Sequence, residues 1–380
     1  MNKRKIIESL NDIIPETMFN VDEQERKRMK KDVERISERI IEETNYVRID
    51  RQDVKLYDKE KELLLSIKMN NFITERIIKE TICLRIDRQR VKLYNKCALL
   101  AEIKLDIFLN EYANKLKNIE ILKMENCAMK EIPKKLLYNN LTMINCSFNE
   151  ITEIPKEIEN CKKLKEFDCE NNKITVIPKE LGKCVNLQIF NCANNKITVI
   201  PKELGKCVNL QYLYCRYNYI RDIPIEISLL INLQEFDCRK NMIIVIPTEI
   251  SELKNLKIFD CSQNRITRIP IEIGKLINLQ KLYCVDNKIK VIPKEIGECE
   301  NMRIIDCRDN QITEIPKEII NLIKLERFYC TNNKIISIPS EISKLIEWRK
   351  FYGTNNKIKE TPEIPAEIDK LKNLREFQWK

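Results

Sequence analysis

The sequence predicts an α/β solenoid, with short parallel strands along an inner curved face and short helical turns along the outer face. Three observations predict it: a phrase of 23 residues recurs from about residue 119 onward, each copy contains a strand-like alternation, and an asparagine follows each alternation. Such copies stack side by side rather than form one globule. The predicted domains are residues 1–118, a mainly helical region, and residues 119–380, about eleven repeats and a partial terminal copy.

The strand of each copy is typified by LQEFDC at residues 233–238. Phe236 and Cys238 are two residues apart, so they share one face of the strand and are expected to point inward. Asp237 lies between them and is expected to point outward. Copies placed side by side therefore give a parallel sheet with one buried face.

An asparagine column follows the strands. Its amide can donate to and accept from the backbone of a bend, so the column is interpreted as a structural ladder. Its members are Asn149, Asn172, Asn195, Asn218, Asn241, Asn264, Asn287, Asn310, Asn333 and Asn356. Next comes a proline with glutamate two residues on, as in Pro178 and Glu180. Proline at the first helical position and a carboxylate near a helix N-terminus favour a short helical turn.

The consensus LxxFxCxxNxIxxIPxEIxxLxN resembles the 23-residue class of leucine-rich repeat. It is similar to the repeats of Ras-pathway scaffold proteins and of the plant intracellular Ras-group proteins. The resemblance covers about two thirds of the chain. It implies the arc-shaped solenoid and, for function, protein–protein binding alone, because members of the family bind unrelated partners.

A cysteine occupies one core position in nine consecutive copies: Cys146, Cys169, Cys192, Cys215, Cys238, Cys261, Cys284, Cys307 and Cys330. In-register side chains on parallel strands point the same way, so their Cβ atoms stay about 4.8 Å apart rather than the roughly 3.8 Å of a disulfide. The column is linear and the chain has no histidine, which argues against a tetrahedral metal site. We expect buried thiols in a reducing compartment.

The composition argues against several other functions. The formal net charge of +10 is spread over many residues of both signs, so we expect no nucleic-acid partner. The chain has no long apolar run, so we expect no membrane insertion and a cytoplasmic location, in the host cytoplasm if the chain is viral. Histidine is absent and none of the five glycines lies in a phosphate-binding motif. We predict no catalytic residues, no metal and no cofactor.

Candidate partner-binding residues come from the exposed strand positions, which vary between copies while the core does not. Tyrosine and arginine are typical of binding hot spots, although exposed strands favour tyrosine anyway. The first group is Tyr212, Tyr214, Arg216, Tyr217 and Arg239. The second group is Tyr283, Arg308, Arg327, Tyr329, Lys350 and Tyr352.

The N-terminal region contains a duplicated unit, YVRIDRQDVKLYDK at residues 46–59 and CLRIDRQRVKLYNK at residues 83–96, 37 residues apart. A cap for the first repeat is its expected role. The shared phrase is either a recognition surface or, as we prefer, the record of a duplication.

Three functions compete: a scaffold, adaptor or inhibitor without activity, an effector-type enzyme such as a repeat-bearing ubiquitin ligase, and a receptor ectodomain. The enzyme would use the N-terminal region, where Cys83 and Cys97 have no histidine to activate them. The ectodomain is opposed by the missing signal sequence and the unpaired cysteine column. The sequence therefore favours a protein-binding module whose partner is unknown.

Overall fold

The computed structural model describes two compact units, Met1–Ala128 and Met129–Lys380. In the first unit it describes residues 46–49, 54–57, 62–65, 83–87, 90–94 and 119–127. In the second it describes residues 129–339, 345, 347–357 and 373–378. Within these residues, no helix combines the length and the apolar character needed to cross a bilayer.

The N-terminal unit contains strands in both copies of the duplicated phrase. Antiparallel pairs join β1 (Tyr46–Ile49) to β2 (Val54–Tyr57), β2 to β3 (Glu62–Leu65), and β4 (Cys83–Asp87) to β5 (Arg90–Tyr94), while β6 (Ile121–Lys123) runs parallel to β5. The alternation of apolar and charged residues in RIDRQxVKLY is a strand signal that the sequence reasoning did not use. The expected helices, at residues 20–45 and 95–116, lie outside the described residues.

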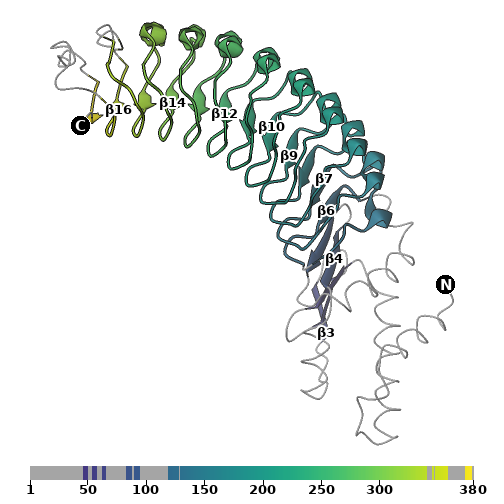
Figure 1. Ribbon diagram of the computed structural model, residues 1–380. Helices are drawn as coiled ribbons and strands as arrows, with labels where there is room; N and C mark the ends of the chain where they lie inside the picture. Colours follow the sequence, from purple (N-terminus) through teal and green to yellow (C-terminus); the bar gives the residue numbers. More distant parts are fainter. Residues whose placement is uncertain are drawn as a thin grey trace, which may run out of the picture. The chain divides into compact units, whose positions relative to one another are not determined.

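The second unit is the predicted solenoid, which the structure confirms (Figure 1). Each repeat contributes one three-residue strand, and successive strands pair in parallel. The strands are β7 (Met143–Asn145), β8 (Glu166–Asp168), β9 (Ile189–Asn191), β10 (Tyr212–Tyr214), β11 (Glu235–Asp237), β12 (Ile258–Asp260), β13 (Lys281–Tyr283), β14 (Ile304–Asp306), β15 (Arg327–Tyr329), β16 (Lys350–Tyr352) and β17 (Glu376–Gln378). From β7 to β16 the register places each residue opposite the one 23 positions later, as with Tyr212 and Glu235.

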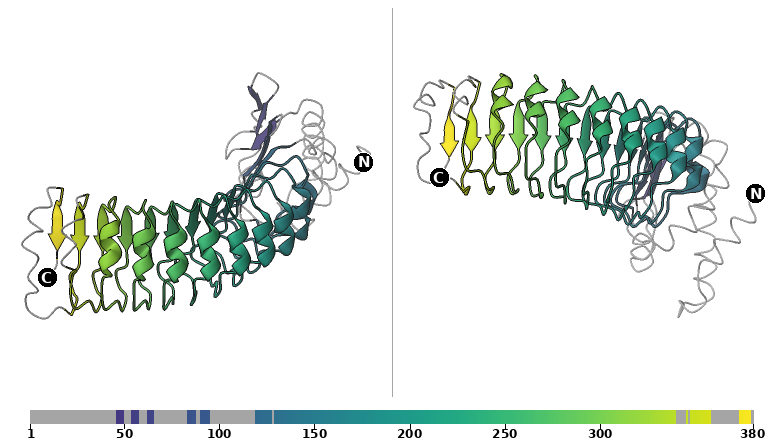
Figure 2. Two further views of the ribbon diagram at one scale, coloured as in Figure 1. Left: turned by 90° about the horizontal axis from the view of Figure 1, so that it is seen from above. Right: turned by 45° about the horizontal axis from the view of Figure 1, so that its top comes forward.

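Short 3-10 helices form the outer layer, opposite the strands (Figure 2). They are η2 (Lys134–Leu136), η3 (Lys156–Asn160), η4 (Lys179–Lys183), η5 (Lys202–Lys206), η6 (Ile225–Leu229), η7 (Thr248–Glu252), η8 (Ile271–Lys275), η9 (Lys294–Glu298) and η10 (Lys317–Asn321). The proline of each repeat precedes its helix instead of occupying the first helical position: Pro178, for example, has φ −69° and an extended ψ of 143°. Each helix of η3–η10 is a turn or so long, a length at which the tighter 3-10 geometry is common.

The core runs as a continuous layer between strands and helices. The middle strand residue, the cysteine after the strand and the central Ile or Leu of the 3-10 helix are buried in each repeat from β8 to β15. Phenylalanines stack across repeats, with ring centroids 5.6 Å apart for Phe167 and Phe190 and for Phe236 and Phe259. Trp348, fully buried, takes the position of a leucine in the repeat where Gly353 replaces the core cysteine.

Burial of the cysteines is confirmed. The fourteen cysteines of residues 127–330 are all buried, with free thiols. Desolvation is the largest cause that raises their pKa values, to about 11 for Cys184 and about 12 for Cys161 and Cys207. Cys184 Sγ donates to the carbonyl oxygen of Ile158 in the preceding repeat, 3.2 Å away. These side chains therefore act as small apolar groups with a weak donor.

The asparagine column forms the expected ladder, and Asn241 shows its bonding. Its Nδ2 donates to the carbonyl oxygens of Cys238 in its own repeat and Cys215 in the preceding one, each at 3.0 Å. Its Oδ1 accepts from the backbone N–H of Ile220 at 2.9 Å. The residue before each asparagine has a left-handed φ, which is 54° at Lys240. One amide thus joins two repeats and satisfies backbone groups on both sides of the bend.

A second asparagine ladder was missed by the sequence reasoning. It follows the 3-10 helices, and each Nδ2 donates to the carbonyl oxygen 24 residues earlier at 2.8–3.0 Å. The members are Asn186, Asn209, Asn232, Asn255, Asn278 and Asn301. The consensus LxN was its signal. Neighbouring repeats are therefore joined by side chains at both ends of the unit.

Candidate partner-binding face

The strands place three rows of side chains on the inner face of the repeat unit. These rows are the first strand position, the third strand position and the residue after the core cysteine; together we call them the inner face. Side chains alternate along a strand, so the first and third positions point opposite to the buried middle residue. The inner face is thus fixed by the same alternation that builds the core.

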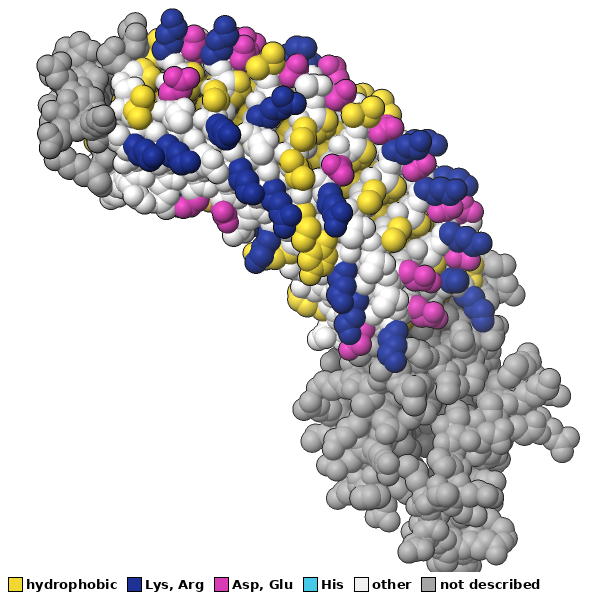
Figure 3. Space-filling model, viewed as in Figure 1, with side chains coloured by type: hydrophobic (Ala, Val, Ile, Leu, Met, Phe, Trp, Pro, Cys, Tyr) yellow, Lys and Arg dark blue, Asp and Glu magenta, His cyan; other side chains and the backbone are white. Residues whose placement is uncertain are grey.

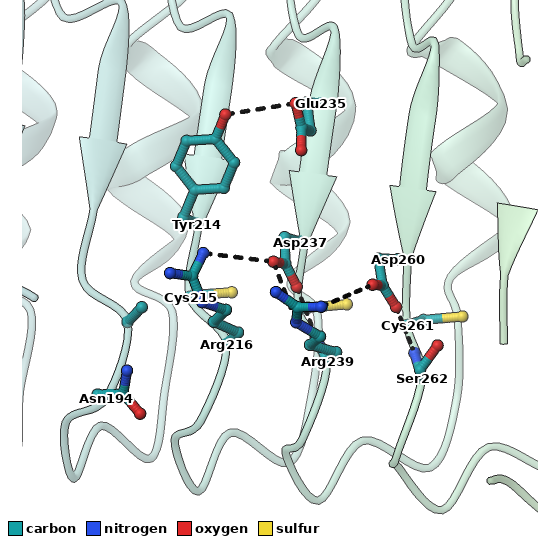
Figure 4. A network of polar contacts seen from close by, with 12 residues as sticks. Asn194, Tyr214, Cys215, Arg216, Glu235, Asp237, Arg239, Asp260, Cys261 and Ser262 are labelled. Carbon is teal, nitrogen blue, oxygen red and sulfur yellow. Dashed lines mark hydrogen bonds and ion pairs between the residues drawn. The ribbon is translucent and has the colours of Figure 1, made fainter. Parts of the chain in front are cut away.

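The first predicted group centres on β10 and β11. The rings of Tyr212 and Tyr214 stack with centroids 6.4 Å apart, and the Tyr214 hydroxyl donates to Glu235 Oε2 at 3.3 Å. Arg216 and Arg239 follow the two strands, and their guanidinium groups lie among carboxylates of neighbouring repeats (Figure 4).

The two arginines and three nearby carboxylates form a network of ion pairs. We call it the arginine–carboxylate network, and its members are Glu170, Arg216, Asp237, Arg239 and Asp260. Arg216 donates to Glu170 at 3.0 Å and lies 3.6 Å from Asp237. Arg239 lies 3.4 Å from Asp237 and 3.7 Å from Asp260. The sequence reasoning selected the two arginines but not their acidic partners. Both guanidinium charges are therefore compensated within the chain.

Tyr217 is placed apart from the rest of the first group. It has a φ of 56°, at the bend after the strand, and Lys240 Nζ lies 4.5 Å from its ring centroid. The bend turns the chain out of the strand rows. Of the first group, the structure thus brings Tyr212, Tyr214, Arg216 and Arg239 together on the inner face.

The second predicted group lies along β13–β16. The rings of Tyr329 and Tyr352 stack with centroids 5.3 Å apart, and the Arg308 guanidinium lies 5.4 Å from the Tyr329 centroid. Arg308 also donates two hydrogen bonds to the Asp306 carboxylate, from Nε to Oδ1 at 2.8 Å and from Nη2 to Oδ2 at 2.6 Å. The Tyr352 hydroxyl donates to Glu376. We call Tyr283, Tyr329 and Tyr352, which share one strand row, the tyrosine row.

Asp237 is the most perturbed carboxyl of the network. Its side chain is only 8% exposed. Desolvation raises its pKa to about 6, the nearby Asp260 charge adds to the rise, and Arg239 and Arg216 oppose it. The carboxylate of Asp237 lies against two guanidinium groups and a second carboxylate, so it has lost most of its hydration, and this loss disfavours its charged form.

Replacing Asp237 by asparagine is expected to change the pH dependence of stability. The folded-state pKa lies above the unfolded value of about 3.9, so the folded state binds the proton more tightly. This carboxyl therefore makes stability fall as pH rises from about 4 to about 6. Urea unfolding between pH 4 and 7 should show a smaller decrease in Asp237→Asn than in the original chain.

The exposed Asp222 supplies the control for that measurement, because Asp222→Asn removes the same charge outside the network. The control should retain the pH dependence of the original chain. Identical profiles for Asp237→Asn and the original chain would contradict the raised pKa.

The inner face carries chemical groups that are suited to binding. Stacked tyrosines and forked guanidinium contacts offer planar surfaces and directed donors. Within the described part of the chain, no group of three or more Cys, Asp or Glu side chains is arranged to hold a metal ion. Figure 3 shows Lys, Arg, Asp and Glu side chains interspersed along the outer edge of the repeats.

Comparison with protein families gives matches over the repeats. A model described as a leucine-rich repeat region matches residues 187–290 and 272–380, and a model of two leucine-rich repeat copies matches residues 139–179. A comparison with curated proteins finds no match.

Solved structures with similar folds come from plants and bacteria. The plant peptide hormone receptor RGFR1, in complex with RGF2, is 30% identical with a TM-score of 0.64 over 71% of this chain and 45% of the receptor. The Leptospira interrogans protein LIC12759 is 27% identical, with a TM-score of 0.53 over 70% of this chain and 79% of that one. An internalin from Listeria monocytogenes is 22% identical, with a TM-score of 0.64 over 77% and 81%. The chain spans less than half of the plant receptor's length.

Proposed function

Because the chain belongs to the leucine-rich-repeat family, we propose that it is a non-enzymatic protein-binding module that holds its partner on the inner face. One observation carries the proposal: core positions repeat almost unchanged, whereas the inner-face rows differ from strand to strand. The third-position row, for instance, passes from Asp168 through Tyr214 and Asp260 to Tyr329. Variation on a fixed frame is how one fold serves different partners.

The frame presents these side chains in a fixed arrangement. Strand β10, for example, is bonded to β9 and β11, and the asparagine ladder ties the bends that follow the strands. Side chains held by such a frame lose little freedom on binding, which favours affinity. Tyr212 and Tyr214 stack on each other before any partner arrives, so their surface is ordered in advance.

We further propose a scaffold, adaptor or inhibitor role in the cytoplasm of a cell. The fourteen buried free thiols favour a reducing compartment. The plant receptor that is similar in fold and sequence is bound to RGF2, so a repeat arc of this kind does hold a ligand. The ubiquitin-ligase alternative gains no support from the repeats, because buried thiols with raised pKa values make poor nucleophiles.

The double substitution Tyr212→Ala and Tyr214→Ala is expected to weaken partner binding at least tenfold. Truncating a central aromatic residue of an interface commonly costs more than about 1 kcal/mol. The immobilised chain would first capture partners from a cell extract, mass spectrometry would identify them, and calorimetry would measure the affinity of each purified partner. Circular dichroism should remain unchanged, since both side chains lie outside the core.

Tyr219 provides the matched control, because it is 48% exposed and lies after the bend, outside the inner-face rows. Tyr219→Ala should bind the partner as the original chain does. Full affinity in the double variant together with lost affinity in Tyr219→Ala would move the binding surface away from the inner face.

A further inference from the structure

We propose that the partner presents an acidic segment, and that this segment docks on the C-terminal part of the inner face at Lys281 and Arg327. This inference rests on the proposed function and names the chemistry of the partner. It comes from three observations: a change in the sign of charge along the sheet, two cations left without an opposing carboxylate, and the apolar surface between and beside them.

The first-position row changes sign along the repeats. Its charged members on β8 and β11 are Glu166 and Glu235, and those on β13, β15 and β16 are Lys281, Arg327 and Lys350. The row ends on β17 with Glu376, which forms an ion pair with Lys350. These positions are equivalent in the repeat, so the change reflects the choice of side chain and not a different backbone. A partner with one charged end would therefore bind in one orientation.

Most cations near this end have carboxylate partners. Lys350 Nζ lies 2.7 Å from Glu376, and Arg303 and Arg349 share Glu326 at 3.4 and 3.8 Å. Lys281 and Arg327 differ: neither forms an ion pair with any residue that the structure describes, and the Arg327 side chain is exposed. Their charges are available to a carboxylate supplied from outside.

The surface between the two cations is apolar. The register places Ile304, which is half-buried, directly between Lys281 and Arg327. In the adjacent row Asp306 lies between Tyr283 and Tyr329, but it is 4% exposed and both of its oxygens accept from Arg308. The repulsion that Asp306 would exert on an acidic partner is thereby reduced, and two tyrosine rings flank the site.

The spacing suits a short peptide segment. Two strand spacings separate Lys281 from Arg327, which is about 10 Å. A segment in the polyproline II conformation, with three residues per turn and about 3.1 Å per residue, covers about the same distance in three residues and returns to the same side, so acidic residues at positions i and i+3 would meet the two cations. An apolar residue between them would contact Ile304 or a tyrosine. The arginine–carboxylate network offers no equivalent site, since its guanidinium groups are already paired.

A nucleic acid fits this surface less well. Phosphate backbones are bound by extended basic surfaces, because each contact neutralises one of many closely spaced charges. Here the carboxylates of Asp260, on β12, and Glu326, directly before β15, would repel a phosphate backbone. Among the described residues of β13–β16, only two cations are unpaired. An acidic peptide is the better match, and nucleic acid becomes an outcome that the experiment distinguishes.

The experiment uses the full chain and three fluorescein-labelled probes. The first is a peptide with repeated Glu-Leu-Leu units, so that glutamates recur at i and i+3; the second has glutamine in place of glutamate; the third is an oligonucleotide of twenty thymidines. Fluorescence anisotropy should show the glutamate peptide binding at least tenfold tighter than the glutamine peptide. The difference should shrink as salt is raised, because exposed charges are screened.

The decisive variant is Lys281→Gln with Arg327→Gln, which should weaken glutamate-peptide binding about tenfold. Lys202→Gln with Lys294→Gln, on the exposed starts of η5 and η9, changes the net charge equally and should leave binding unchanged. Both pairs are outside the core, and unfolding curves would confirm that each variant is as stable as the original chain.

Three results would overturn the inference: equal affinity for the two peptides, undiminished glutamate-peptide binding by the Lys281 and Arg327 variant, or tighter oligonucleotide binding that depends on the same two residues. The proposed function is judged separately by the Tyr212 and Tyr214 variant. If that variant loses its partner while the peptide result is negative, the inner face still binds a protein, but not through an acidic segment.

Discussion

Replacing Asn241 by alanine is expected to lower the free energy of unfolding by about 3 kcal/mol. The change removes two 3.0 Å hydrogen bonds to the carbonyl oxygens of Cys215 and Cys238 and leaves the N–H of Ile220 without its acceptor. A buried polar group left unpaired costs about 1–3 kcal/mol, and this substitution affects several in one place. Urea unfolding followed by circular dichroism measures the loss.

Asn255 allows a matched comparison from the second ladder. It donates to the carbonyl oxygen of Ile231 at 2.8 Å, but it is exposed, so water replaces the lost donor in Asn255→Ala. We expect that variant to lose less than about 1 kcal/mol. Equal losses in the two variants would show that burial of the ladder is not what makes Asn241 important.

The fourteen thiols of residues 127–330 are expected to react with Ellman's reagent about a thousandfold more slowly in the folded chain than in urea. All fourteen are buried, so reaction requires opening of a repeat, and an opening free energy of about 4 kcal/mol gives that factor. Raised pKa values, such as about 11 for Cys184, reduce the reactive thiolate further. The assay counts thiols at pH 8 before and after denaturation.

Cys83 and Cys97 serve as the internal reference, because they lie outside the repeats. At most these two of the sixteen cysteines should react fast in the folded chain. The slow thiols should also differ by position, since repeats near an end open more easily than central ones. Fast reaction of Cys238 or Cys261, identified by mass spectrometry, would contradict the buried column.

The solenoid, the asparagine ladder and the buried cysteines could be predicted because the residue pattern for each recurs in many repeats. One Phe and one Cys two residues apart indicate little; the same spacing repeated at intervals of 23 residues fixes which side of the strand is buried. The strands at residues 46–94 were not foreseen, although RIDRQxVKLY alternates as a strand does. Helical patterns in the flanking residues outweighed that short signal.

The sequence could predict which residues lie on the inner face, but not which of their charged side chains form ion pairs. Arg216 and Glu170 are 46 residues apart, which places them two repeats from each other along the sheet. Their contact depends on the direction in which the two long side chains extend across the strands, and the sequence does not give that direction. Tyr217 was grouped with Tyr212 and Tyr214 because all three lie in one repeat. The strand ends at Tyr214, and Tyr217 lies at the left-handed bend that follows it.

Because all junctions between repeats are alike, the distance between two regions of the sheet can change by whole repeats. Because neighbouring units meet through the same in-register strands and the same amide bonds, a whole unit can be gained or lost by recombination without new contacts. Each such event moves the tyrosine row relative to the arginine–carboxylate network by one strand spacing, about 4.8 Å. The number of units between the two regions thus sets the distance that separates them.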